Sequence, residues 1–417
     1  MTEKSLNLET LLSPLGVEEF FDRYWERNHL HIPGRSAAYY RPLMNSQDLE
    51  QIISNPDARY PAIQLAKSGR YFPPEAYTRN IKFGSEVFVG VPDLERIGIE
   101  YRNGASIVLP ALHRTWLPLR NLCAAIETQI DHVPHGNAYI TPGNAAGFTP
   151  HYDVHEVFVL QIAGKKRWSL FPPTIHLPLR SQPFTPEGYD APTPMVQVDL
   201  SPGDLLYLPR GYIHSAETLD WYSAHVTIGI SVFTWSDLIQ DAGEHGIHNE
   251  ELRKGLPAGF AKRTDLQCTL RQHLRELLPH RDHSDYEQLV ETFVRRVRSR
   301  QSLPSRRFRI DIVAIDEQSW LQTPAKSQYR LIQEADNTIL EFRGKRHCFP
   351  SELASTLRTI SERSDFRVAE LPANVSAEAR LGLSRYLLDL GFLTPPDGTS
   401  SANSESHSSA SSIICAR

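Results

Sequence analysis

The residues with the clearest chemical potential are His151 and Asp153, in the run Thr149-Pro150-His151-Tyr152-Asp153. Side chains two residues apart point to the same face of an extended strand, so this imidazole and this carboxylate can reach one ion together. Two histidines and one carboxylate form the facial ligand set that holds iron(II) and leaves positions open for an oxo-acid and dioxygen. A His-x-Asp pair alone is also compatible with two solvated loop residues. If the strand continued, His155 would share this face, as a third ligand or as a surface or substrate-side histidine.

A second histidine with a defined frame is His214, which ends the pattern G-x5-P-x-G-x2-H that begins at Gly203. The pattern predicts an apolar strand, a turn fixed by Pro209 and opened by Gly211, and a histidine at the start of the returning strand. An ordinary hairpin with a chance histidine is the alternative. The spacing resembles the second motif of the cupin superfamily, whereas the first motif is matched in part, because Asp153 stands where three-histidine cupins carry His. We therefore expect His151, Asp153 and His214 to share one metal.

Composition bounds the class of protein. With 417 residues the chain is long enough for two or three domains, and its 40% apolar and 22% charged residues are typical of a soluble globular protein. The net charge of -5 gives no general attraction to nucleic acid or anionic membranes. We find no signal-peptide core and no apolar run long enough to span a bilayer. The scattered cysteines contain no Cys-x-x-Cys pair, which indicates a reducing cytoplasm and leaves metal binding to His and carboxylates.

The elements that must position these residues differ along the chain. Residues 17–31 have helical apolar spacing, and residues 46–130 alternate helical stretches with loops rich in Pro and Arg. Between about 135 and 235, short apolar runs separated by Gly and Pro predict a jelly-roll core. The strands are expected at residues 157–160, 168–171, 205–208 and 225–232.

Beyond residue 235 the pattern changes again. Residues 266–278 and 286–297 predict amphipathic helices, and residues 306–397 mix short strands with helices, including one over 377–390. The tail that follows is Ser-rich and too polar to pack, so we expect it to be disordered.

Longer stretches of the chain resemble the JmjC ribosomal oxygenases, which hydroxylate a side chain of a ribosomal protein. The segment His151–Trp168 (HYDVHEVFVLQIAGKKRW) resembles the core motif of that family, and Tyr207–His214 (YLPRGYIH) resembles its third-ligand turn. Residues 20–26 (FFDRYWE) resemble its opening helix, and residues 342–350 (FRGKRHCFP) resemble the start of its winged helix. One departure is Gly229, which stands near a position often filled by Ser and could loosen the co-substrate pocket.

The resemblance implies an α+β fold with a double-stranded β-helix core of the JmjC/cupin type and flanking helices. It places a JmjC oxygenase domain with an N-terminal helical extension at 1–235 and a helical dimerisation domain at 236–305. A winged-helix-like domain follows at 306–397 and the disordered tail at 398–417.

Winged helices often bind DNA. Residues 306–397, however, carry 13 Lys plus Arg and 13 Asp plus Glu, so nucleic-acid binding is disfavoured there.

The resemblance also implies roles for four further residues. Lys166 stands where these enzymes grip the distal carboxylate of 2-oxoglutarate, although a solvated hairpin lysine would read the same way. Asn137 and Tyr139 would line the same pocket, with a turn Asn and a core Tyr as alternatives. Thr227 would close it, although a β-branched residue suits any strand.

We therefore expect a cytoplasmic, homodimeric iron(II)- and 2-oxoglutarate-dependent dioxygenase that hydroxylates Arg or His in a protein, a large-subunit ribosomal protein above all. Three rivals stay open. The same core serves oxygenases acting on histones, other peptides or free amino acids. A non-catalytic cupin-like binding module could retain the ligands. A nucleic-acid regulator would require a salt-dependent association with DNA, against which the balanced charge argues.

Overall fold

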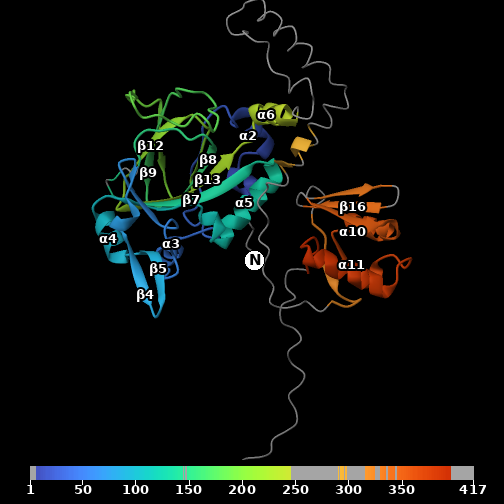
Figure 1. The fold of residues 1–417 in the computed structure, drawn as a ribbon. Coiled ribbons are helices and arrows are strands. Elements are labelled where there is room, and N and C mark those ends of the chain that lie inside the picture. The colour runs from blue at the N-terminus through green and yellow to red at the C-terminus, as the bar shows by residue number, and fades with distance from the viewer. Residues whose placement is uncertain are drawn as a thin grey trace, which may run out of the picture. The chain divides into compact units, whose positions relative to one another are not determined.

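The structure, a computed structural model, describes residues 6–143, 145, 148–245, 290, 292–294, 296–297, 315–324, 329–334, 337–342 and 345–395. The chain divides into two compact units, Met1–Phe293 and Val294–Arg417 (Figure 1). Within the described residues, no helix combines the length and the apolar character needed to cross a bilayer.

Two antiparallel sheets form the centre of the first unit. The larger has eight strands in the order β1-β11-β8-β13-β7-β6-β2-β3, and the smaller has three in the order β10-β9-β12. The strands of the larger sheet are β1 (Leu30–Ile32), β2 (Gln64–Lys67), β3 (Arg70–Tyr71), β6 (Ser106–Leu109), β7 (Val133–Pro142), β8 (Glu156–Ala163), β11 (Leu205–Leu208) and β13 (Tyr222–Ser231). Those of the smaller are β9 (Lys166–Phe171), β10 (Val196–Leu200) and β12 (Ile213–Thr218), and a separate hairpin pairs β4 (Thr78–Phe83) with β5 (Glu86–Pro92).

The central strand β8 shows how the two sheets are held together. Its residues Val157 and Val159 pack in one apolar cluster with Trp168 of the smaller sheet. The alternate residues Phe158 and Leu160 belong to a second, larger cluster that includes the N-terminal helices. Because side chains alternate across a strand, β8 is buried on both faces and reads as a continuous apolar run. The predicted jelly-roll core, with its four predicted strands, is confirmed.

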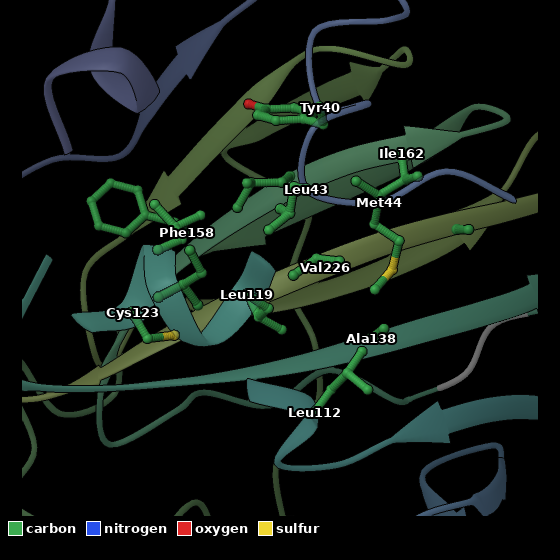
Figure 2. Packing of buried hydrophobic residues seen from close by; sticks show 14 of the residues in the cluster. Tyr40, Leu43, Met44, Leu112, Leu119, Cys123, Ala138, Phe158, Ile162 and Val226 are labelled. Atoms are coloured by element: carbon green, nitrogen blue, oxygen red, sulfur yellow. The ribbon is translucent and has the colours of Figure 1, made fainter. Parts of the chain in front are cut away.

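Helices cover the outer face of the larger sheet (Figure 2). In α5 the buried residues Leu119, Leu122, Cys123 and Ile126 form one stripe at helical spacing. A Cβ at Gly136 of β7 would lie 2.6 Å from Leu119 Cδ2, so this close packing of α5 on β7 depends on glycine. The helices among the described residues of this unit are α1 (Leu8–Leu12), α2 (Val17–Arg23), α3 (Ser46–Ile53), α4 (Leu94–Arg102), α5 (Leu117–Ile130) and α6 (Trp235–His245), with 3-10 turns η1 (Pro74–Ala76) and η2 (Leu112–Arg114).

Two predictions for the N-terminal part were wrong in detail. The helix expected over residues 17–31 ends at Arg23, and residues 30–32 form β1, which pairs with β11. The edge of the sheet offers these residues backbone partners that local spacing does not reveal. Residues 46–130 contain, besides helices and loops, the strands β2 to β6.

The second unit has its own apolar core. Its strands β15 (Tyr329–Gln333), β16 (Asn337–Phe342) and β17 (Lys345–Pro350) form one antiparallel sheet, and β14 (Trp320–Gln322) pairs with β18 (Asp365–Arg367). The part of this unit that the structure describes contains the helices α10 (Ala354–Glu362) and α11 (Ala377–Asp389), with 3-10 turns η5 (Ser351–Leu353) and η6 (Val368–Glu370). The predicted mixture and the helix over 377–390 are confirmed. The predicted helix over 266–278, part of that over 286–297, and the tail lie outside the described residues.

Phe158 tests the importance of the larger cluster. It is fully buried, and its ring lies 5.6 Å from that of Phe20 and 5.1 Å from that of Tyr207, measured between centroids. Phe158→Ala should lower the free energy of unfolding by about 3–5 kcal/mol, because it leaves a cavity. The matched control is Phe83→Ala in the hairpin, where the side chain is 78% exposed and the loss should stay below about 0.5 kcal/mol. Equal losses in chemical denaturation would contradict this account.

Candidate metal centre

The structure brings His151, Asp153 and His214 together, with one potential ligand atom from each within 4.8 Å of the others. His214 begins β12 with Ile213, whereas His151 and Asp153 lie in the irregular segment before β8. The backbones of the two histidines pair antiparallel: His151 N donates to His214 O at 3.1 Å, and His214 N donates to His151 O at 2.8 Å. The predicted convergence therefore arises from one isolated pair of residues rather than from a regular strand.

Both imidazoles present the same nitrogen to the centre of this cluster. His151 Nδ1 lies 2.8 Å from the carbonyl oxygen of Thr149, and His214 Nδ1 lies 3.0 Å from that of Tyr212. A carbonyl oxygen can only accept, so each Nδ1 carries the hydrogen and each Nε2 keeps a free lone pair. His214 Nε2 lies 3.7 Å from Asp153 Oδ2. Two Nε2 atoms and one carboxylate oxygen fit the donor set of a divalent transition metal.

The electrostatics of the cluster favour the protonation states that bind metals. Burial raises the pKa of the Asp153 carboxyl, but the imidazoles of His155, His214 and His151 outweigh that effect and hold the pKa below its usual value. Burial, together with His151, lowers the pKa of His214 to about 4. At neutral pH the carboxylate is therefore charged and His214 is neutral, as metal ligation requires.

A cavity of about 280 Å³ opens beside the three residues. All seven predicted site residues line it: Asn137, Tyr139, His151, Asp153, Lys166, His214 and Thr227. His155, left open as a ligand or a substrate-side residue, also lines the cavity, and its Nε2 lies 4.0 Å from Asp153 Oδ1.

Lys166 is a buried cation in the wall of this cavity. Its side chain comes from the first residue of β9, is 3% exposed as a residue, and donates from Nζ to Thr141 Oγ1 at 3.1 Å. Among the described residues, no carboxylate lies within ion-pairing distance of Nζ. Burial lowers its pKa to about 7. A buried amine without a counter-ion is suited to the carboxylate of a ligand.

The remaining predicted residues lie on β7 and β13, which pair so that Asn137 faces Thr227 and Tyr139 faces His225. Asn137 Oδ1 accepts a hydrogen bond from Ala111 N at 2.9 Å, so this side chain also fixes a turn. Burial raises the pKa of Tyr139 above its usual value, and its ring stacks on His225 at 5.0 Å between centroids. Asn137 therefore both lines the cavity and holds a turn through its side chain.

Sequence reasoning missed Thr141 and His225. A signal for both exists in the strand period: Asn137, Tyr139 and Thr141 alternate with Ala138 and Ile140 of the core. His225 stands two residues before Thr227 on β13 and shares its face. Polar residues at every second position of a buried strand are thus the sequence signal that predicts the place of Thr141 and His225 in the cavity.

The structure leaves no open space at Gly229. A Cβ at this position would lie 2.4 Å from His135 Nε2 and 3.1 Å from His155 Cε1. The space is filled by these two imidazoles, whose rings meet edge to face at 4.7 Å.

Residues 113–238, which contain all seven predicted site residues, match the model of the JmjC domain family. The matched region includes β7 to β13, the three candidate ligands and most of the cavity wall, whereas the lining residues Tyr71 and Ser106 lie outside it.

The relatives to which this chain is similar are considerably longer than the aligned part. The chain is 33% identical over 264 residues to ribosomal oxygenase 1 of Bos taurus, which covers 60% of this chain and 38% of that protein. It is 30% identical over 279 residues to the bifunctional lysine-specific demethylase and histidyl-hydroxylase NO66 of Dictyostelium discoideum, covering 61% and 50%. The aligned part thus spans between about two fifths and one half of these relatives. The solved Escherichia coli ribosomal oxygenase YcfD has a TM-score of 0.48 and 15% identity, covering 92% of this chain and 98% of that one.

The buried lysine predicts a pH dependence. With a pKa of about 7 in the folded state against 10.5 in the unfolded chain, Lys166 binds fewer protons when folded over that window. The wild type should therefore gain stability as pH rises from 7 to 10.5, by up to about 1.4 kcal/mol per pH unit. Lys166→Met cannot gain stability in this way. Its free energy of unfolding, relative to that of the wild type, should therefore fall between pH 7 and 10.5 when measured by chemical denaturation without oxo-acid. The adjacent exposed lysine gives the control, Lys165→Met. A difference from wild type that does not vary with pH would contradict the assignment.

Proposed function

We propose that this chain is an iron(II)- and 2-oxoglutarate-dependent oxygenase that hydroxylates a side chain of a protein, above all of a large-subunit ribosomal protein. The observation that carries the proposal is the presence of two chemically distinct groups in one cavity. A set of two Nε2 atoms and one carboxylate suits a divalent metal, and a buried lysine that has no carboxylate partner in the described part of the chain suits a dicarboxylate. The target would be Arg or His, and the names of the relatives, ribosomal oxygenase and histidyl-hydroxylase, support a ribosomal protein as substrate.

In this proposal the side chains of His151, Asp153 and His214 would hold iron(II) beside the cavity. Iron(II), with 2-oxoglutarate and dioxygen, supplies the oxidising power that inserts oxygen into an unactivated C–H bond and releases succinate and carbon dioxide. Lys166 grips the distal carboxylate of 2-oxoglutarate, with Thr141 orienting the ammonium. The aromatic residues that line the cavity, among them Tyr139, Phe148 and Trp168, would limit the water around these contacts and so strengthen them.

Asn137, Tyr139 and Thr227 would complete the co-substrate pocket. The Tyr139 ring lies against His225, which holds it in place. Thr227 faces Asn137 across the β7–β13 pair, so the two polar side chains enter the cavity at the same level. Their role would be to donate hydrogen bonds to the co-substrate or to contact the target side chain.

We further propose the domain organisation implied by the resemblance: an oxygenase domain over 1–235, a helical dimerisation domain over 236–305 and a winged-helix-like domain over 306–397. The sheet β15-β16-β17 with α10 and α11 has the element types of a winged helix. The equal numbers of basic and acidic residues in this part favour a structural or partner-positioning role over DNA binding. A cytoplasmic homodimer belongs to the same proposal.

Replacing a ligand tests the metal site. His151→Ala and Asp153→Ala should each abolish binding of Co(II), used as a probe, and substrate-dependent succinate formation, because two remaining ligands do not hold the ion. Titration calorimetry and succinate detection by mass spectrometry measure the two effects. Asp57→Ala, at an exposed turn, is the matched control and should bind Co(II) as the wild type does. Unchanged turnover in the ligand variants would refute the proposal.

Two adjacent lysines test the co-substrate site. Lys166→Ala should weaken 2-oxoglutarate binding by about tenfold or more while leaving Co(II) binding intact, because a charge-assisted hydrogen bond to the distal carboxylate is lost. Lys165→Ala removes an exposed lysine next to it and should leave the affinity unchanged. Calorimetric titration of 2-oxoglutarate into the Co(II)-loaded variants separates the outcomes. The assignment fails if both substitutions behave alike.

A further inference from the structure

The two segments that carry the candidate ligands run side by side without regular strand pairing. His151 pairs with His214, and Val157 pairs with Leu208 where β8 and β11 begin their ladder. Both pairs keep one antiparallel register, since the same number of residues separates them on each segment. In the stretch between them, one backbone hydrogen bond crosses, from Gly211 N to Asp153 O at 3.0 Å. The position of Asp153 relative to His214 is therefore set by few backbone contacts.

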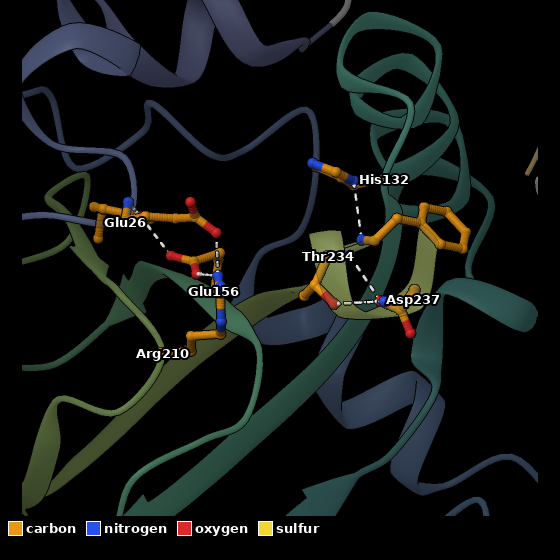
Figure 3. A network of polar contacts seen from close by, with 8 residues as sticks. Glu26, His132, Glu156, Arg210, Thr234 and Asp237 are labelled. Atoms are coloured by element: carbon orange, nitrogen blue, oxygen red, sulfur yellow. Dashed lines mark hydrogen bonds and ion pairs between the residues drawn. The ribbon is translucent and has the colours of Figure 1, made fainter. Parts of the chain in front are cut away.

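A buried ion pair crosses the same stretch. Glu156, the first residue of β8, is fully buried and lies shortly after Asp153 in the chain. Arg210, in the turn shortly before His214, is 6% exposed. Arg210 Nη1 lies 2.7 Å from Glu156 Oε1 (Figure 3). The pair thus joins the two ligand segments by side chains, between the two points where their backbones pair.

Further side-chain contacts hold both Glu156 and Arg210. The hydroxyl of Tyr207 donates to Glu156 Oε2, so both carboxylate oxygens have a donor. Arg210 Nη1 also contacts the carboxylate of Glu26, in the loop after α2 (Figure 3). Glu26 N in turn donates to the Tyr207 hydroxyl at 3.0 Å. The N-terminal segment therefore closes this network behind the ligand segments.

We propose that Glu156 and Arg210 are positioning residues that fix the separation of Asp153 from His214 before a metal binds. This inference rests on the proposed function, because it takes these two residues as metal ligands. A buried pair of this kind is weak evidence for stability alone, since desolvation offsets the attraction. The pair crosses the stretch where one backbone hydrogen bond joins the two segments, so it can fix the separation of these segments. A site whose ligands are already in place loses less freedom on binding, so loss of the pair reduces metal affinity.

The test is the affinity of the full chain for Co(II), measured by calorimetry well below the melting temperature of the least stable variant. Arg210→Met and Glu156→Gln should each weaken Co(II) binding by about 10- to 100-fold at unchanged stoichiometry. The double variant should bind Co(II) about as tightly as the single variant with the lower affinity, because the two residues act as a unit. Arg210→Lys keeps the charge and should recover part of the affinity. The matched control is Arg167→Met, which breaks the exposed pair between Arg167 and Asp199, 2.6 Å apart on β9 and β10.

The outcomes distinguish the positioning role of Glu156 and Arg210 from the metal site itself. Folded Arg210→Met and Glu156→Gln variants that bind Co(II) like the wild type overturn the positioning role, even if their melting temperatures fall. Should Arg210→Met fail to fold, Glu156→Gln and Arg210→Lys decide by the same criterion. A wild type that does not bind Co(II), or binds it as well with His151→Ala, overturns the metal site itself and this inference with it.

Discussion

The antiparallel pairing of His151 with His214 is the constraint on which the site depends. These residues come from distant parts of the chain, and two mutual backbone hydrogen bonds place them directly opposite each other. The register is the one that β8 and β11 adopt further along the sheet. A slip by one residue would turn alternate side chains away from the cavity. The core packing that fixes this register, with β8 buried on both faces, is thus also what fixes the geometry of the candidate ligands.

The same strands serve stability and chemistry on opposite faces. On β7, Ala138 and Ile140 belong to the apolar core, whereas Asn137 and Tyr139 line the cavity. This division lets the polar cavity keep a defined shape, because its walls are anchored by close packing behind them. Lys166 differs from these residues, since its burial is costly and no carboxylate of the described residues pairs with it. Such local destabilisation is expected where a ligand is to supply the missing charge.

The sequence was most informative where local pattern and tertiary structure agree. The apolar run at Leu205–Leu208 with its Pro-Gly turn predicted β11 and the return of His214 correctly, because strand and turn signals are both local. The three-residue strand β1 carries no pattern of its own and forms because an open edge lies beside it. The spacing of His151 and Asp153 predicted their convergence, although the segment is not a regular strand. Thr141 has no motif, and its place follows from the pairing of β7 with β6 and β13.

The three residues of β1 protect one edge of the larger sheet. They cover the outer edge of β11, which is apolar and otherwise borders the sheet. An uncovered strand of this kind is a template for another chain, and natural proteins protect such edges. A chain shortened from its N-terminus past Ile32 would expose this edge next to the turn that carries His214. It would be prone to self-association through the very strand that leads into the site.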